Sequence, residues 1–338
     1  MTRTATIVLA GILLSVLTGC AATAEADPTH SPEPVPSAEP SAEPAAAPKP
    51  AIALGGSCDA LVDEATLSGL VGGDVAPIEA ENFGRVWAIA VLGGLDCGWM
   101  EQDGDAYVQL EVIPATGLDA QVAAAGAASP ECGFGGSDPE RMCSFSTEVG
   151  GYWFSGIVSV SNAATDTAPG VIEELTSRLE AAAAESAPVP AVLPPGMWIA
   201  HDDCAAFGAS IDTSAILGMP FTAAEGNRGG PATPGFVGSI EAVGDFPCVW
   251  SSADGNRWFA TELLPGAGWG VTELSSTEGA ESVVVDGAVQ AVVLPVDGGG
   301  SVVYATDGAN LAWVSVPGDV DRTTASALTA AVMDAASR

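Results

Sequence analysis

An internal repeat led by cysteines constrains the fold more than any other feature of this chain. Residues 58–72 (CDALVDEATLSGLVG) align without gaps to residues 204–218 (CAAFGASIDTSAILG), and residues 97–114 (CGWMEQDGDAYVQLEVIP) align to residues 248–265 (CVWSSADGNRWFATELLP). In the second pair of blocks, Cys-x-Trp, Asp-Gly, Glu and Pro recur at matching positions. Two ungapped blocks in the same order do not readily arise by coincidence. We therefore interpret the chain as a tandem duplication that builds two similar domains.

Composition marks where the two copies begin and end. Residues 20–53 consist largely of Pro, Ala, Ser and Glu. Such a segment buries too little apolar surface to offset the entropy of ordering, so we predict a disordered tether there. A second Ala/Pro-rich stretch provides a linker at 187–196. The domains are then 54–186 and 197–338, and each is long enough to enclose its own core.

The first block of each copy has the start and stop signals of a short helix. Asp63 and Asp212 are suitable N-caps, because a short acidic side chain accepts hydrogen bonds from the first free backbone N–H groups. Gly72 and Gly218 are suitable helix ends, because glycine adopts the left-handed conformation at little cost.

Alternation and turn signals predict antiparallel strands. The Asp-Gly pairs at 103–104 and 254–255 lie between alternating apolar runs, which favours hairpins. Residues 107–112 alternate with period two and direct their valines and leucine towards the core. Further predicted elements are a helix at 116–127, strands at 142–147 and 152–161, a helix at 168–185, strands at 288–294, 301–306 and 311–316, and a helix at 323–336. Because hairpins dominate, we expect an α+β fold with helices packed on a mostly antiparallel sheet in each domain.

The N-terminus has the pattern of an export signal. A single early arginine precedes an apolar run that is too short to span a bilayer, so residues 1–19 are predicted to be a signal peptide. Leu17-Thr18-Gly19-Cys20 resembles the bacterial lipobox. That resemblance implies that Cys20 receives a diacylglycerol and becomes the first residue, with membrane lipid as the partner of its acyl chains. An ordinary signal peptide, cleaved nearby with loss of Cys20, is the alternative.

Export accounts for the other cysteines, which are even in number and would lie in an oxidising compartment. They are Cys58, Cys97, Cys132, Cys143, Cys204 and Cys248. Six cysteines allow fifteen connectivities. Equivalence between the copies favours 58–97 and 204–248, which leaves 132–143 to close a small loop in the first copy.

The charge of the chain excludes one class of partner. The chain has 43 Asp plus Glu against 9 Lys plus Arg, a net charge of −34. It offers no basic patch to neutralise phosphates, so we expect no nucleic-acid binding. The acidity keeps the protein soluble, adapts it to salt, or attracts a specific cationic partner.

The repeat resembles a domain of unknown function found in actinobacterial cell-envelope lipoproteins. The residues that carry this resemblance are Cys58, Leu61, Gly72, Cys97 and Trp99 in the first copy, and Cys204, Gly218, Cys248 and Trp250 in the second. The second copy has Phe207 where the pattern has leucine. The resemblance implies location outside the membrane and assigns no catalytic residue.

Groups suited to catalysis or metal binding are scarce. His201 heads His201-Asp202-Asp203-Cys204, but its cysteine is committed to a bridge, so we expect a polar turn and no metal site. The glycines at 266–270 lack the lysine of a phosphate loop and are interpreted as a strand-to-helix turn. The Asp-Gly pairs at 254, 286, 297 and 307 lack the ligand spacing of a calcium loop and are interpreted as hairpin turns.

Four residues form a candidate ligand face. Glu111 and Glu262 occupy the same strand position in the two copies, and by alternation they share a face with Tyr107 and Trp258, opposite the core. Such a face is ordinarily solvated. As a binding surface, its aromatic ring would supply contact area and its acid would orient a cationic or hydroxylated ligand. Trp99 and Trp250 are expected in the core beside their bridges.

These observations favour a lipid-anchored, extracytoplasmic protein on the outer face of the cell membrane. We expect a non-enzymatic binding or interaction module of the cell envelope, with an unknown ligand and no cofactor. The alternative is an accessory or sensor subunit that regulates a neighbouring membrane protein. A hydrolase with an unrecognised site is a third possibility, because a serine or cysteine nucleophile needs a base beside it and His201 is the one histidine outside the tether.

Overall fold

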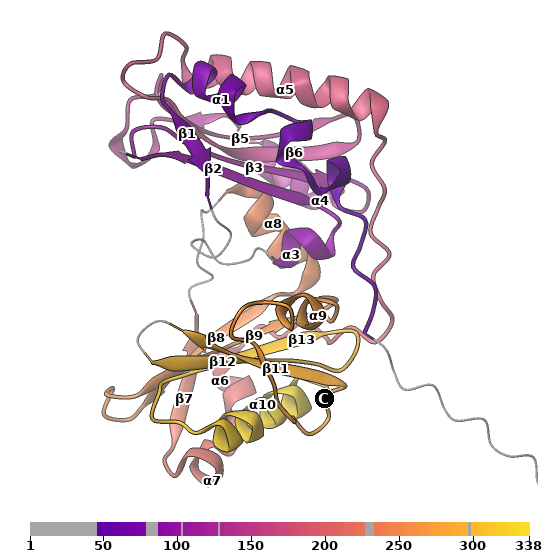
Figure 1. Ribbon diagram of the computed structural model, residues 1–338, viewed down its shortest axis with the longest axis vertical. Helices are drawn as coiled ribbons and strands as arrows, with labels where there is room; N and C mark the ends of the chain where they lie inside the picture. The colour runs from indigo at the N-terminus through magenta and orange to yellow at the C-terminus, as the bar shows by residue number, and fades with distance from the viewer. Residues whose placement is uncertain (1–45, 79–86, 103, 128, 227–232, 297–298) are drawn as a thin grey trace, which may run out of the picture. The chain divides into compact units, whose positions relative to one another are not determined.

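The computed structural model describes residues 46–78, 87–102, 104–127, 129–226, 233–296 and 299–338 (Figure 1). Residues 1–45 lie outside this part, and with them the predicted signal peptide, Cys20 and most of the predicted tether. Within the described residues, no helix combines the length and the apolar character needed to cross a bilayer.

The first sheet has six antiparallel strands in the order β1-β2-β3-β6-β5-β4. The strands are β1 (Val75–Pro77), β2 (Leu95–Glu101), β3 (Tyr107–Pro114), β4 (Glu131–Cys132), β5 (Met142–Val149) and β6 (Tyr152–Ser159). The helices of this half are η1 (Ala53–Gly56), η2 (Cys58–Ala60), α1 (Glu64–Val71), α3 (Trp87–Val91), α4 (Asp119–Gly126), η3 (Phe134–Gly136) and α5 (Ala168–Glu185).

The second sheet has seven antiparallel strands in the order β10-β11-β12-β13-β9-β8-β7. The strands are β7 (Phe221–Glu225), β8 (Phe246–Ser252), β9 (Trp258–Leu264), β10 (Glu281–Ser282), β11 (Gln290–Val296), β12 (Gly300–Thr306) and β13 (Leu311–Val316). The helices are α6 (Cys204–Ala209), α7 (Thr213–Leu217), α8 (Pro234–Val243), α9 (Gly270–Leu274) and α10 (Arg322–Ala336).

The predicted α+β fold with two similar domains is confirmed. Apart from the extra edge strand β10, the two sheets follow the same order, with β7, β8, β9 and β13 in the places of β1, β2, β3 and β6. One long helix covers one face of each sheet: α5 on the first and α10 on the second (Figure 1). The buried tryptophans Trp99 and Trp250 lie in these two cores, as expected.

The predicted helix ends are also confirmed. The side chain of Asp63 accepts a hydrogen bond from the backbone N–H of Thr66 at 2.9 Å, and Asp212 accepts from Ala215 at 3.0 Å. Gly72 ends α1 and Gly218 ends α7, each in the left-handed conformation with φ of 74°.

Two elements begin later than predicted, because a local turn precedes each of them. The helix expected at 116–127 begins at Asp119, since Leu118 closes a turn onto the carbonyl of Ala115 at 2.9 Å. The strand expected at 288–294 begins at Gln290, since the N–H of Ala288 bonds to the carbonyl of Val285 at 3.1 Å.

The three disulfides pair as predicted: Cys58–Cys97, Cys132–Cys143 and Cys204–Cys248. The two equivalent bridges have similar spans, with Cα–Cα distances of 5.9 Å and 5.8 Å. Each joins the helical start of its domain to the strand that carries Cys-x-Trp. In the chain-entropy description, one such bridge stabilises the fold by about 3–4 kcal/mol.

Helices α3 and α8 form a layer that contacts both sheets. On α3, Trp87 and Val91 pack with the second domain's Trp269, whereas Ile89 packs with Ile113 of the first sheet. On α8, Ile240 and Val243 belong to the second domain's cluster.

Close approach of α8 to the first sheet depends on a glycine. A Cβ atom on Gly238 would lie 2.3 Å from the ring of Trp153, so only glycine allows the helix to come this near. As a consequence, the face of each sheet that is not covered by α5 or α10 is covered by residues from both halves of the chain. Sequence periodicity did not predict either α3 or α8.

The described end of the predicted tether lies against the folded part. The backbone N–H of Ala47 donates to the carbonyl of Gly308 at 2.7 Å, and that of Ala53 donates to Gly93 at 2.8 Å. The ammonium of Lys49 lies 2.8 Å from the carboxylate of Glu273 and 4.8 Å from the ring centroid of Trp269. Residues 46–53 therefore have fixed partners in the second domain and the first.

Candidate functional site

The candidate ligand face in the first domain is covered. Strand β3 is buried on both faces. The sequence pattern predicted that one of these faces would be exposed to solvent, but α8 lies over that face. Glu111 is only 1% exposed, so its carboxyl group lies inside the protein.

Glu111 is held by two hydroxyl groups. Ser155, directly opposite on β6, donates to Oε2 at 2.8 Å. Thr233 donates to Oε1 from the N-cap of α8, where its own oxygen also accepts the backbone N–H of Phe236 at 3.4 Å. The carboxyl therefore lies at the positive end of α8. It links the first sheet to a helix whose N-cap follows Glu111 by 122 residues in the chain.

A second carboxyl faces Glu111 across the β2–β3 pair. Asp96 is the cross-strand partner of Glu111 and is mostly buried. Gln109 donates its amide to Asp96, and the hydroxyl of Tyr107 donates to the amide oxygen of Gln109 at 3.2 Å. We call these six residues the acidic junction: Asp96, Tyr107, Gln109, Glu111, Ser155 and Thr233.

Burial perturbs the titration of the junction. Burial, with the nearby charge of Asp96, raises the pKa of Glu111 to about 8 against the hydrogen bonds from Thr233 and Ser155. Burial raises the pKa of Asp96 to about 6, and burial with the two carboxylates raises the pKa of Tyr107 to about 12. At neutral pH Glu111 therefore keeps its proton, which is the expected response of a buried acid beside a second acid.

The two predicted residues of the second copy have different surroundings. The carboxylate of Glu262 accepts a hydrogen bond at 2.6 Å from the indole of Trp313, which lies directly opposite on β13. Trp258 lies at the surface with 61% exposure. The structure thus places Tyr107 and Glu111 in one cluster and Trp258 and Glu262 on the other sheet.

His201 packs as an aromatic ring. Its centroid is 5.1 Å from that of Phe207 and 5.4 Å from that of Phe246, and its Nε2 is buried. The neighbouring Asp203 caps α6 by accepting the N–H of Ala205 at 2.8 Å. Among the described residues, no three His, Cys, Asp or Glu side chains come together as metal ligands would.

The glycine and Asp-Gly motifs lie in turns. Residues 266–269 lie in the connection from β9 to α9, and Gly270 is the first residue of α9. Asp254 accepts the hydroxyl of Ser252 at 2.6 Å inside the β8–β9 turn, and Asp307 accepts the N–H of Asn310 at 2.8 Å inside the β12–β13 turn. Asp286 lies in the connection from β10 to β11, and Asp297 lies outside the described residues.

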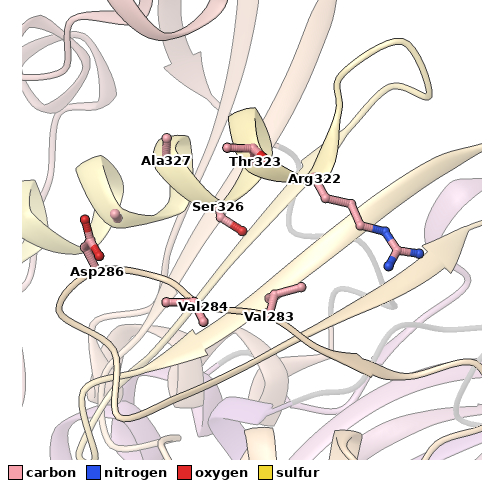
Figure 2. Close-up of a pocket in the computed structure, with 8 residues that line it drawn as sticks. Val283, Val284, Asp286, Arg322, Thr323, Ser326 and Ala327 are labelled. Atoms are coloured by element: carbon pink, nitrogen blue, oxygen red, sulfur yellow. The ribbon is translucent and has the colours of Figure 1, made fainter.

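A groove of about 430 Å³ follows α10 on the surface of the second domain (Figure 2). We call it the α10 groove. Its lining is Val283, Val284, Asp286, Arg322, Thr323, Ser326, Ala327 and Ala330. Figure 2 shows Asp286 and Arg322 at opposite ends, with the two valines facing the helix between them. Val284 is 85% exposed, so this apolar side chain is not used by the core.

A second groove, of about 530 Å³, follows the C-terminal half of α5 in the first domain. Residues of η1 and η2 form its other wall, and Arg178 and Glu185 supply its charges. Neither groove is lined by a residue of the acidic junction. Sequence reasoning missed four residues of the junction: Asp96, Gln109, Ser155 and Thr233. It also missed the α10 groove, for which the run of three valines at 283–285 was the available signal.

Comparisons with known proteins do not place the chain in a family. No family model, no curated protein and no solved structure matches it. The similarity to actinobacterial lipoproteins stays a prediction from the quoted motif, and the function is argued from the site.

Proposed function

We propose that this protein is a non-enzymatic binding or interaction module of the cell envelope, held by a lipid on Cys20 at the outer face of the membrane. The observation that carries the proposal is the α10 groove, where an exposed apolar strip lies between two opposite charges. An apolar surface flanked by a few oriented polar groups is the usual form of a binding site.

Two further observations support the location. The lipobox-like residues Leu17-Thr18-Gly19-Cys20 follow a short apolar run. All six cysteines of the described residues form disulfides, which persist in oxidising compartments outside the cytoplasm.

A sensor or accessory subunit is the second candidate, and the acidic junction favours it. A protonated Glu111 at the contact between α8 and the first sheet couples the packing of the two halves to pH. In this candidate the partner is a neighbouring membrane protein that responds to that packing.

Site-specific photo-crosslinking tests the proposal in cells. A photoreactive amino acid replaces Ala327 in the α10 groove, and the matched control replaces Ala206, an exposed alanine of α6 in the same domain. We expect a discrete crosslinked product from position 327 that is absent from position 206. Identical patterns at the two positions would argue against a binding module in this groove.

The anchor has its own test. Intact-mass analysis of the protein extracted from membranes should show the mass of a diacylglycerol on Cys20, and a Cys20→Ala variant should leave the membrane fraction. An unmodified mass in the membrane fraction would remove the lipid anchor from the proposal.

A further inference from the structure

The single lysine of the chain lies against an aromatic ring and a carboxylate of the second domain. The ammonium of Lys49 is 4.8 Å from the ring centroid of Trp269 and 2.8 Å from a carboxylate oxygen of Glu273. An aromatic face attracts a cation through the quadrupole of its ring, and a carboxylate attracts it by charge. Together they are the groups with which proteins recognise ammonium ions.

The ring and the carboxylate are held in place without the lysine. Trp269 directly precedes α9 in helical conformation and Glu273 lies four residues further on, so the two side chains are neighbours on one side of the helix. Trp269 also packs against Trp87 of α3, with ring centroids 5.4 Å apart. A Cβ atom on Gly270 would lie 2.1 Å from the ring of Trp87, so α3 packs directly on the backbone of α9. The site is therefore formed before a cation enters it.

The lysine reaches this site from a segment that is weakly held, residues 46–53, which we call the strap. Its backbone is hydrogen-bonded to the folded part at Ala47 and at Ala53. Lys49 stands between two prolines, which have no N–H to donate. The side chains of Lys49 and Glu273 are each 40% exposed, and an ion pair this open to water is weak. A cation from solution can therefore reach the site and replace the lysine.

From this geometry we propose that Trp269 and Glu273 form a binding site for ligands with a primary or quaternary ammonium group. Lys49 occupies this site as an internal competitor until such a ligand displaces it. Displacement frees the middle of the strap, at the point where the predicted tether joins the folded part. None of these three residues lines the α10 groove, so the inference goes beyond the proposed function and concerns a second site.

The charge and the connectivity of the chain set the terms of this competition. The net charge of −34 attracts cations to the surface of the protein. The lysine belongs to the same chain as its site, so it competes as though it were present at about millimolar concentration. A ligand must therefore exceed the lysine in affinity or in local concentration.

Titration with choline, followed by ligand-observed NMR, tests the site. The protein is the full chain in nanodiscs of phosphatidylglycerol, a lipid without an ammonium group. The matched ligand is 3,3-dimethylbutan-1-ol, which has the shape of choline and no charge. If the lysine fills the site for about nine-tenths of the time, Lys49→Ala should bind choline about tenfold more tightly than the wild type. Lys49→Arg should bind choline as the wild type does, because a guanidinium keeps both contacts.

A second substitution tests the carboxylate. Glu273→Gln, added to Lys49→Ala, should cancel the gain in choline affinity. Glu278→Gln is its matched control, because it removes the same charge from an exposed glutamate that follows α9. The gain should persist with Glu278→Gln, and the neutral alcohol should show no such differences between the variants.

Hydrogen exchange at residues 46–53 follows the strap. In the wild type, saturating choline should speed the exchange of these backbone amides, and 3,3-dimethylbutan-1-ol should not. Ammonium groups also occur in lipid headgroups, so the measurement is repeated in nanodiscs that contain phosphatidylethanolamine. Faster exchange there without choline would identify a lipid headgroup as the ligand, and faster exchange with choline alone would identify a soluble amine.

Three outcomes would overturn the inference. The first is equal choline affinity, or none, in the wild type and Lys49→Ala, because the lysine would then not compete for the site. The second is choline binding that Glu273→Gln leaves unchanged, and the third is equal binding of the neutral alcohol. Crosslinking at position 327 measures a different surface, so a failure here leaves the binding module of the α10 groove in place.

Discussion

Replacing Glu111 with glutamine removes the most perturbed carboxyl group in the described part of the protein without changing its shape. In the folded protein its pKa is raised from 4.5 to about 8, chiefly by burial. Between these two values the folded state holds a proton that the unfolded chain has released. The group therefore stabilises the fold fully at acidic pH, and this contribution is lost as pH rises through about 8.

The size of the effect follows from the two pKa values. Each pKa unit corresponds to about 1.4 kcal/mol, so Glu111 lowers the free energy of unfolding by about 5 kcal/mol between pH 4.5 and pH 8. For a domain of this size, 1 kcal/mol shifts Tm by about 2–4 °C, which predicts a fall of about 10–20 °C over that interval. Glutamine does not ionise, and its amide oxygen can still accept the hydroxyl of Ser155.

Urea unfolding followed by tryptophan fluorescence, repeated from pH 5 to pH 9, measures this difference. We expect the wild type to lose stability with pH and the Glu111→Gln variant to lose much less, with the variant the more stable protein above pH 8. Glu148→Gln is the control, because Glu148 is an exposed glutamate of the same sheet. This substitution removes one negative charge, as Glu111→Gln does, but it removes no buried carboxyl group. Equal pH slopes for the wild type and Glu111→Gln would refute a protonated, buried Glu111.

Three further predictions test the packing. Gly238→Ala should destabilise the protein by about 1–3 kcal/mol, because its Cβ would lie 2.3 Å from the ring of Trp153, whereas Gly69→Ala, with nothing within 4 Å, should be neutral or stabilising in chemical denaturation. Thr233→Val should cost about 1–3 kcal/mol by removing both the cap of α8 and a hydrogen bond to Glu111, and an unchanged unfolding midpoint would contradict that contact. Non-reducing peptide mapping should recover the same three disulfides, and any link between the two domains would disprove the pairing.

The fold of each domain could be predicted from the sequence, because helix caps and hairpin turns depend on residues that are close together in the chain. Asp63 and Gly72 delimit α1 through contacts within one or two turns of helix, and the Asp-Gly pair at 254–255 closes its own hairpin. The repeat supplied the one long-range constraint, since equivalent cysteines implied equivalent bridges.

The acidic junction was not accessible in this way, because its environment comes from distant parts of the chain. The alternating pattern along β3 correctly placed Glu111 on the face opposite the core that α5 covers. No periodic signal in the sequence showed that α8 would cover this second face. The helix α3 is only five residues long, and α8 follows a glycine-rich stretch. Neither helix therefore has a hydrophobic pattern in the sequence that is long enough to predict it. The α10 groove likewise depends on where α10 lies relative to β10, and this is a tertiary property.

The shared layer of α3 and α8 has a practical consequence for anyone who divides this protein. A cut in the connection at 187–196 would leave each half without groups that shield its sheet from water. The second half would lose the side chains of Trp87 and Val91, and the first would lose Ala242 and the helix backbone at Gly238. Either fragment produced alone would expose a broad apolar surface and associate with itself. Two fragments synthesised together in one cell would instead reassemble, as the halves of a split reporter do.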